Sequence, residues 1–139
     1  MENEMTIQQI KRWFEVAVPE PTPHNASVQY GCHLEEVSEG LLASLDSIDA
    51  EMVSQLAHDY KHGMELAIAN REEMLDALCD QIVTAIGVAH MLGMDIEGAL
   101  QEVARSNDSK FVDGLPIFNE SGKIMKGPNY TKPDLSDFV

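Results

Sequence analysis

Along most of the chain, apolar residues recur at intervals of three and four positions, which is the spacing of one face of an α-helix. The segments with this pattern are about 6–16, 25–46, 47–63, 70–92 and 95–103. Residues that begin or end helices flank them, such as Gly93 after the fourth segment and Asp95 before the fifth. We therefore expect an all-α fold, a bundle of four or five antiparallel helices.

The chain changes character after Arg105, where turn-forming residues replace the helical pattern. This predicts a helical core over about 25–105 and an irregular tail over 106–139. Within the tail, 115–118 and 123–125 are candidates for a small β-hairpin. With 139 residues, 44% of them hydrophobic, the chain can bury one core, so we expect a single domain over 1–139.

Composition narrows the choice of function. Only 6% of the residues are aromatic, and Met, Leu and Ala are plentiful, which favours helices over sheets. The net charge of −15 argues against a nucleic-acid partner, because such a surface needs clustered Lys and Arg. An anionic substrate would need a metal ion as an intermediary.

Several features predict a cytoplasmic protein without a membrane partner. The N-terminal segment is acidic and lacks the apolar core of a secretory signal, and no run approaches the expected length of a membrane span. Cys32 and Cys79 fall in helical patterns, where we expect buried, reduced thiols.

Two acidic clusters are the candidate chemistry. Glu36 and Glu39 share one side of the second predicted helix, because successive residues turn by about 100°. Glu73, Asp76 and Asp80 fall within about 60° of one another on the fourth. Two such faces turned toward each other would form a cage of carboxylate oxygens, which suits Mg²⁺ or Mn²⁺.

The simpler interpretation is that these carboxylates lie on solvated helix faces. It suits the first cluster, since Leu34, Val37 and Leu41 form an apolar stripe on the opposite side. The second cluster differs, because its helix continues beyond Asp80 as a segment that is apolar nearly all round and is expected to be buried. Carboxylates in line with a buried face are costly unless they are neutralised, so we favour a bound metal ion.

The order of these motifs resembles a known family. Glu35-Glu36-x-x-Glu39, followed by Glu73-x-x-Asp76, is similar to the signature of the all-α nucleoside triphosphate pyrophosphohydrolases. These include MazG-type enzymes, dimeric dUTPases and phosphoribosyl-ATP pyrophosphohydrolases. The tail resembles the carboxyl end of a phage and bacterial branch, through Ser-Asn-Asp-Ser-Lys at 106–110, Gly-Lys-x-x-Lys-Gly-Pro-x-Tyr at 122–130 and Pro-Asp-Leu at 133–135. The resemblance extends from about residue 28 to the end.

The sequence departs from the family pattern in two respects. The gap between Glu39 and Glu73 is longer than in compact members, and the second motif has two possible registers. Glu73 with Asp76 reproduces the letters of the motif, whereas alignment through Gly93 puts Asp80 at its aspartate. Asp76 is a candidate in both registers.

The resemblance implies Mg²⁺-dependent hydrolysis of a nucleoside triphosphate, or a related nucleotide, between the α- and β-phosphates. The products would be a monophosphate and pyrophosphate. The implied metal ligands are Glu36, Glu39, Asp76 and Asp80, with Glu73 in reserve, and Mn²⁺ is the alternative metal. Glu35 is implied as the catalytic carboxylate that positions or deprotonates the attacking water.

The resemblance also implies that the tail contacts the nucleotide. The expected substrate-binding residues are Asn107, Lys110, Lys123, Lys126 and Tyr130. Lysines that only increase solubility are the alternative. Proteins of this kind form dimers or tetramers, so a homodimer or homotetramer is implied.

Other functions stay open. A dUTP-selective pyrophosphatase and a phosphoribosyl-ATP pyrophosphohydrolase differ from the favoured function only in substrate, and pocket shape decides between substrates. A non-enzymatic, oligomerising helical binding protein, whose carboxylates only keep it soluble, is the alternative from another class.

Overall fold

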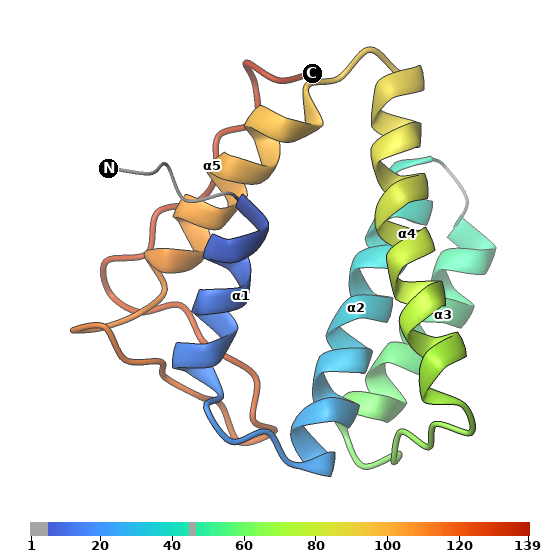
Figure 1. The fold of residues 1–139 in the computed structure, drawn as a ribbon, viewed down its shortest axis with the longest axis vertical. Helices are drawn as coiled ribbons and strands as arrows, with labels where there is room; N and C mark the ends of the chain where they lie inside the picture. Colours follow the sequence, from blue (N-terminus) through green and yellow to red (C-terminus); the bar gives the residue numbers. More distant parts are fainter. Residues whose placement is uncertain (1–5, 45–46) are drawn as a thin grey trace. The chain divides into compact units, whose positions relative to one another are not determined.

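The computed structural model describes residues 6–44 and 47–139, and within these ranges the chain forms five α-helices and no β-strand (Figure 1). The all-α prediction is confirmed. The chain divides into two compact units. The α2–α3 unit comprises the described residues of Glu20–Ala67 together with Phe118–Ile124. The α1–α4–α5 unit comprises those of Met1–Pro19 together with Ile68–Ile117 and Met125–Val139.

In the α2–α3 unit, α2 (Pro23–Ala43) begins earlier than expected. Its N-cap is Thr22, whose hydroxyl accepts a hydrogen bond from the Asn25 amide at 3.2 Å, while Asn25 Oδ1 accepts one from the Thr22 amide at 2.8 Å. Pro23 fits the first turn, where its missing N–H has no helical partner to lose. The expected start of the helix, with Asn25 or Ser27 as its cap, is therefore wrong by a few residues. The expected end near residue 46 lies outside the described residues.

Helix α3 (Ser47–Lys61) lies beside α2, and the two pack through small residues. The Ser38 hydroxyl donates a buried hydrogen bond to the Ala50 carbonyl at 2.8 Å. A Cβ added to Gly31 would lie 2.8 Å from the Ala57 carbonyl oxygen, so the backbones approach closely there. The apolar stripe of α2 is only partly covered, since Val37 is 43% exposed while Leu34 and Leu41 are half-buried. Small residues lie at the contact with α3 because only they allow this close approach.

In the α1–α4–α5 unit, α1 (Thr6–Ala17) lies beside α5 (Ile96–Asp108) (Figure 1). Trp13 Nε1 donates a hydrogen bond to the Asn107 carbonyl at 2.9 Å, and the Trp13 ring stacks on Phe111 with centroids 5.1 Å apart. These contacts extend α5 through 106–108, where the sequence predicted the beginning of the tail. Tertiary hydrogen bonds outweigh the weak helix preference of Ser, Asn and Asp there.

Within the α1–α4–α5 unit, the tail packs along α5, whereas its segment Phe118–Ile124 belongs to the α2–α3 unit. The two candidate runs, 115–118 and 123–125, pair through the isolated antiparallel bridge Phe118–Ile124. Further on, the Thr131 carbonyl accepts a hydrogen bond from the Ser106 hydroxyl at 2.8 Å, and the Phe138 carbonyl accepts one from the Asp95 amide at 2.8 Å. The predicted hairpin is thus reduced to a single bridge.

Helix α4 (Arg71–Met91) begins and ends as the sequence predicts. Asn70 caps its N-terminus, Gly93 takes the left-handed conformation with φ +75°, and Asp95 then caps α5. Its apolar surface, however, is exposed. The exposed apolar residues are Leu75, Leu78, Ile82, Val83, Ile86, Val88 and Met91.

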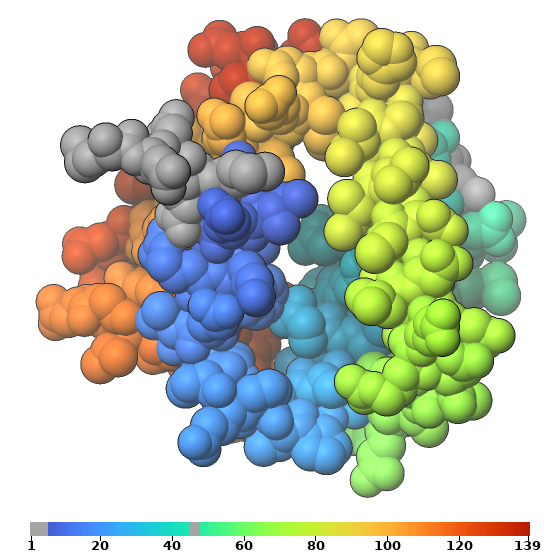
Figure 2. Space-filling view, in the orientation of Figure 1, coloured from blue at the N-terminus to red at the C-terminus, as the bar shows by residue number. Residues whose placement is uncertain are grey.

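Within its own unit, α4 is therefore not buried and Cys79 is exposed with it, contrary to the predictions. Among the described helices of its unit, α4 contacts only α5. Its yellow-green surface is seen along its length in Figure 2. Cys32 is half-buried, and both cysteines are free thiols.

The expectation that no segment approaches the length of a membrane span also needs correction. At 21 residues, α4 is long and apolar enough to cross a membrane by length and composition. Core helices of soluble proteins pass the same test, so this property is weak evidence for a membrane segment.

Candidate functional site

Glu36 and Glu39 form a carboxylate pair on α2. They are three residues apart, and their carboxyl groups are close enough to share a hydrogen bond. The pKa of Glu36 is raised, first by partial loss of hydration and then by the charge and hydrogen bond of Glu39. A carboxylate pair in this state favours a bound proton or a cation.

Glu35, the neighbouring carboxylate, faces two lysines. Lys61 Nζ at the end of α3 and Lys123 Nζ in the tail each lie 3.0 Å from Glu35 Oε2. Burial alone would raise the pKa of Glu35, but the hydrogen bonds from Lys61 and Lys123 and their charges outweigh it and lower the pKa. A carboxylate stabilised in this way is a weaker base.

The loop within Phe118–Ile124 holds Lys123 in place. Asn119 Oδ1 accepts hydrogen bonds from the Ser121 amide at 3.0 Å and the Lys123 amide at 2.9 Å. Gly122 takes a left-handed conformation with φ +84°, which an L side chain rarely adopts. The Ser121 carbonyl lies 3.3 Å from Nε2 of His24, in the first turn of α2. The loop is thus fastened to α2 at both His24 and Glu35.

Cys32 lies one helical turn before Glu35 and Glu36. Burial raises the pKa of its thiol, and the charges of Lys123 and Lys61 lower it by less. Cys32 is therefore a packed neutral thiol beside the charged groups. A raised pKa leaves a smaller fraction of the thiol as the nucleophilic thiolate.

The second acidic cluster lies on α4. Glu73, Asp76 and Asp80 are all exposed, and the Glu73 amide donates a hydrogen bond to Asn70 Oδ1 at 3.1 Å. Over residues 6–44 and 47–139, no three His, Cys, Asp or Glu side chains form a group that could hold a metal ion. The meeting of the α2 and α4 carboxylates at one cation stays a prediction.

The predicted substrate-binding residues of the tail fall into two sets. In the α1–α4–α5 unit, Lys126 Nζ lies 4.8 Å from the centroid of the Tyr130 ring, and the Lys110 carbonyl accepts a hydrogen bond from Gly127 at 3.0 Å. The Asn107 carbonyl accepts the hydrogen bond from Trp13. Lys123 belongs to the α2–α3 unit, where it pairs with Glu35.

Lys61 lies outside the motifs that the sequence offers for the site. A signal was present, because a short connection makes α2 and α3 antiparallel neighbours and brings the last turn of α3 near the first half of α2. The register that selects Lys61 depends on the close contact at Gly31, where an added Cβ would lie 2.6 Å from Lys61 Cγ. That contact is a tertiary property.

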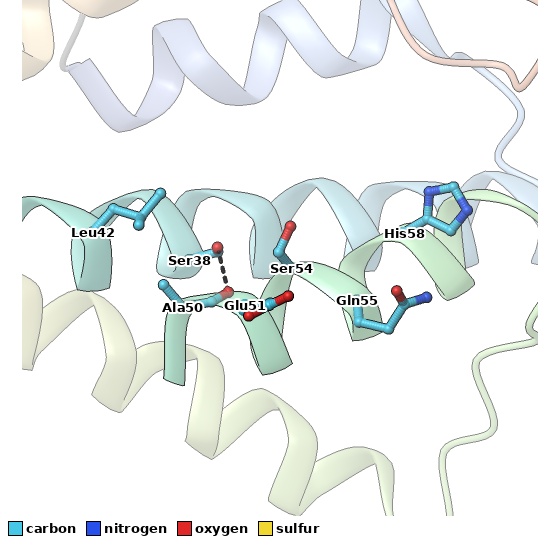
Figure 3. A pocket seen from close by; sticks show the side chains of 7 residues that line it. All are labelled: Ser38, Leu42, Ala50, Glu51, Ser54, Gln55 and His58. Atoms are coloured by element: carbon cyan, nitrogen blue, oxygen red, sulfur yellow. Dashed lines mark hydrogen bonds between the residues drawn. The ribbon is translucent and has the colours of Figure 1, made fainter. Parts of the chain in front are cut away.

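A shallow hollow of about 420 Å³ lies along the same pair of helices (Figure 3). It is lined by Ser38, Leu42, Ala50, Glu51, Ser54, Gln55 and His58. The Ser38–Ala50 hydrogen bond joins α2 and α3 among these residues. Among the described residues, the lining contains the carboxylate of Glu51 and no lysine or arginine. Such a lining does not suit a polyphosphate.

Comparison with known proteins adds no assignment. No family model matches the sequence, and no curated protein or solved structure matches it either. The resemblance to the nucleoside triphosphate pyrophosphohydrolases therefore stays a prediction from the motifs.

Proposed function

We propose that this protein is a Mg²⁺-dependent nucleoside triphosphate pyrophosphohydrolase, which cleaves its substrate between the α- and β-phosphates. The observation that carries the proposal is the arrangement on α2. The carboxylate pair of Glu36 and Glu39 adjoins Glu35, whose oxygen accepts hydrogen bonds from Lys61 and Lys123. A site for a cation thus adjoins two ammonium groups suited to phosphate oxygens.

The donor set fits Mg²⁺. Glu36 and Glu39 offer only oxygen ligands, and a cation between them would relieve the repulsion that, together with the larger effect of burial, raises the pKa of Glu36. Asp76 and Asp80 of α4 are the proposed further ligands, with Glu73 in reserve. When bound, Mg²⁺ supplies neutralisation of phosphoryl charge and a lowered pKa for a coordinated water.

The chain's own residues then bind and orient the nucleotide. Lys123, whose charge interacts with Glu36 of the carboxylate pair, is the proposed contact to phosphate oxygens there. The proposed contacts from the rest of the tail are Lys110, Lys126, Asn107 and Tyr130. Glu35 was expected to position or deprotonate water. Its two lysine partners make it a weak base, so we assign it the orientation of the lysines instead.

A homodimer or homotetramer is part of the proposal. Four residues of α4, Leu75, Leu78, Ile82 and Ile86, lie within about 80° of one another and are exposed. A soluble chain rarely leaves such a stripe in water, so we propose that α4 of a second copy covers it. Asp76 and Asp80 in the same helix disfavour a lipid environment, where carboxylates are costly.

The test of the proposed function is pyrophosphate release from a panel of ribonucleoside and deoxyribonucleoside triphosphates, including dUTP, and from phosphoribosyl-ATP. We expect Mg²⁺-dependent release from at least one substrate and none from Glu36→Gln. Glu15→Gln, which removes an exposed carboxylate on α1, is the matched control and should behave as wild type.

The rival is a non-enzymatic helical binding protein, and the exposed surface of α4 suits it equally well. Two results together would support this rival: the folded wild-type protein releases no pyrophosphate from any substrate, and Mg²⁺ with a non-hydrolysable nucleotide does not raise its thermal stability.

A further inference from the structure

Lys61 has no role in the motifs, yet the structure places it in the charged cluster on α2. Two ammonium groups share one carboxylate oxygen there, since Lys61 Nζ and Lys123 Nζ are each 3.0 Å from Glu35 Oε2. The three groups together carry one excess positive charge. Such a cluster is unusual in a chain with 24 acidic and only nine basic residues.

The spacing of the two lysines suits a phosphoryl group. Because both nitrogens lie 3.0 Å from the same atom, they are separated by no more than 6.0 Å. A phosphoryl group placed between ammonium groups at such a distance can accept a hydrogen bond from each, through different oxygens, at about 2.8 Å.

The surroundings restrict the motion of Lys61. Its side chain is 14% exposed, whereas that of Lys123 is 42% exposed. The Lys61 stem crosses α2 over Gly31, where a Cβ would lie 2.6 Å from Lys61 Cγ. The ammonium group is therefore positioned before any ligand arrives, which lowers the entropy cost of binding.

We propose that Lys61 is a substrate-binding residue, which grips one phosphoryl group of the nucleotide together with Lys123. Glu35 is the positioning residue that keeps both ammonium groups at the site. This inference rests on the proposed function. It adds a binding residue from α3, outside every motif that suggested that function.

The neighbouring carboxylates make the site dependent on metal. Glu36 lies close enough to Lys123 for their charges to interact. A cation held by Glu36 and Glu39 would offset that negative charge and leave the lysines to attract the phosphoryl group. Inorganic pyrophosphate should therefore bind more tightly with Mg²⁺ than without it.

The test measures pyrophosphate binding by calorimetry, with no turnover involved. Lys61→Met keeps most of the aliphatic stem and removes the charge, and Lys61→Arg keeps the charge. We expect Lys61→Met to weaken binding by about tenfold or more, as for loss of a charge-assisted hydrogen bond. Lys61→Arg should lose less, because it can still donate to phosphate. Lys11→Met, which removes an exposed lysine from α1, is the matched control and should bind as wild type.

A wild-type measurement does not depend on the folding of a variant. In a pyrophosphate titration with Mg²⁺, the side-chain NMR signals of Lys61 and Lys123 should shift together. Unshifted Lys61 signals, or Lys61→Met binding equal to that of Lys11→Met, would overturn the inference. If pyrophosphate binding depends on Lys61 but no nucleotide is hydrolysed, the phosphoryl-binding role of Lys61 stands, and its role toward a nucleotide substrate fails together with the proposed hydrolase function.

Discussion

Lys123 Nζ donates a hydrogen bond at 3.0 Å to Oε2 of Glu35, which lies 88 positions earlier in the chain. The contact fastens the loop within Phe118–Ile124 to α2 and brings a tail lysine next to the motif carboxylates. Burial would lower the pKa of Lys123, but its hydrogen bond to Glu35 raises it. The lysine thus stays protonated at neutral pH, as a phosphate-binding group requires.

The first prediction concerns the carboxylate pair. Glu36→Gln and Glu39→Gln should each reduce kcat by more than about a hundredfold, because a lost ligand costs at least as much as a lost supporting group. The measurement is steady-state pyrophosphate release at fixed Mg²⁺, with circular dichroism to verify folding. Wild-type turnover in either variant would remove that residue from the site.

The same pair predicts a pH effect on stability. The folded-state pKa of Glu36 lies above its usual value, so its ionisation costs stability as pH rises through that range. Glu36→Gln without metal should therefore be more stable than wild type at pH 7, by a few tenths of a kcal/mol after solvent screening. The difference should vanish below about pH 4. Thermal unfolding across this range is the measurement, and a less stable variant at pH 7 would contradict it.

Another prediction concerns which pair of carboxylates in the second acidic motif binds the metal ion, Glu73 with Asp76 or Asp76 with Asp80. Glu73 and Asp80 are about 10 Å apart along the axis of α4, too far to bind one small ion together, while Asp76 lies between them. We expect Asp76→Asn and Asp80→Asn to be inactive and Glu73→Gln to keep measurable turnover. Inactive Glu73→Gln with active Asp80→Asn would establish the other register. Loss of activity in all three would indicate two metal ions.

The exposed stripe of α4 predicts the assembly state. Ile82→Lys or Ile86→Lys should shift the protein to monomers and weaken association by at least about a hundredfold, because a charge would enter an apolar interface. Light scattering after size exclusion measures this. Met52→Lys, at an exposed apolar residue of α3, is the control and should keep the wild-type mass. A monomeric wild-type protein that floats with liposomes would instead favour a membrane as the partner of α4.

Another prediction concerns the attachment of the tail to α5. Glu102 Oε1 accepts hydrogen bonds from Arg105 Nη2 at 2.6 Å and from the Asp134 amide at 3.1 Å, which lower the pKa of Glu102 to about 2. The ionised carboxylate therefore stabilises the fold at neutral pH, and its effect is lost as pH falls from about 4 toward 2.

Glu102→Gln should therefore increase hydrogen exchange at 131–134 and lower Tm at pH 7. Its difference from wild type should shrink at acidic pH. Glu97→Gln, on the same helix, is the control. Equal exchange in the two variants would mean that Glu102 does not hold the tail.

Local sequence signals were sufficient to predict the helices and most of their ends. The helix ends at Asn70, Gly93 and Asp95 could be predicted because capping depends on neighbours within one turn. The same local geometry placed Glu36 beside Glu39 on α2, and Asp76 beside Asp80 on α4.

The contacts between these helices, in contrast, depend on how the chain packs. The α2–α3 packing through Gly31 and Ser38 selects Lys61 as a partner of Glu35, and contacts from Trp13 accompany the extension of α5 into the predicted tail. The hydrophobic periodicity of α4 also did not predict its burial correctly. An apolar surface indicates that a helix packs against another surface, but not which surface that is. Long-range pairs such as Glu35 with Lys123 depend on helix register and loop conformation, which are properties of the folded chain.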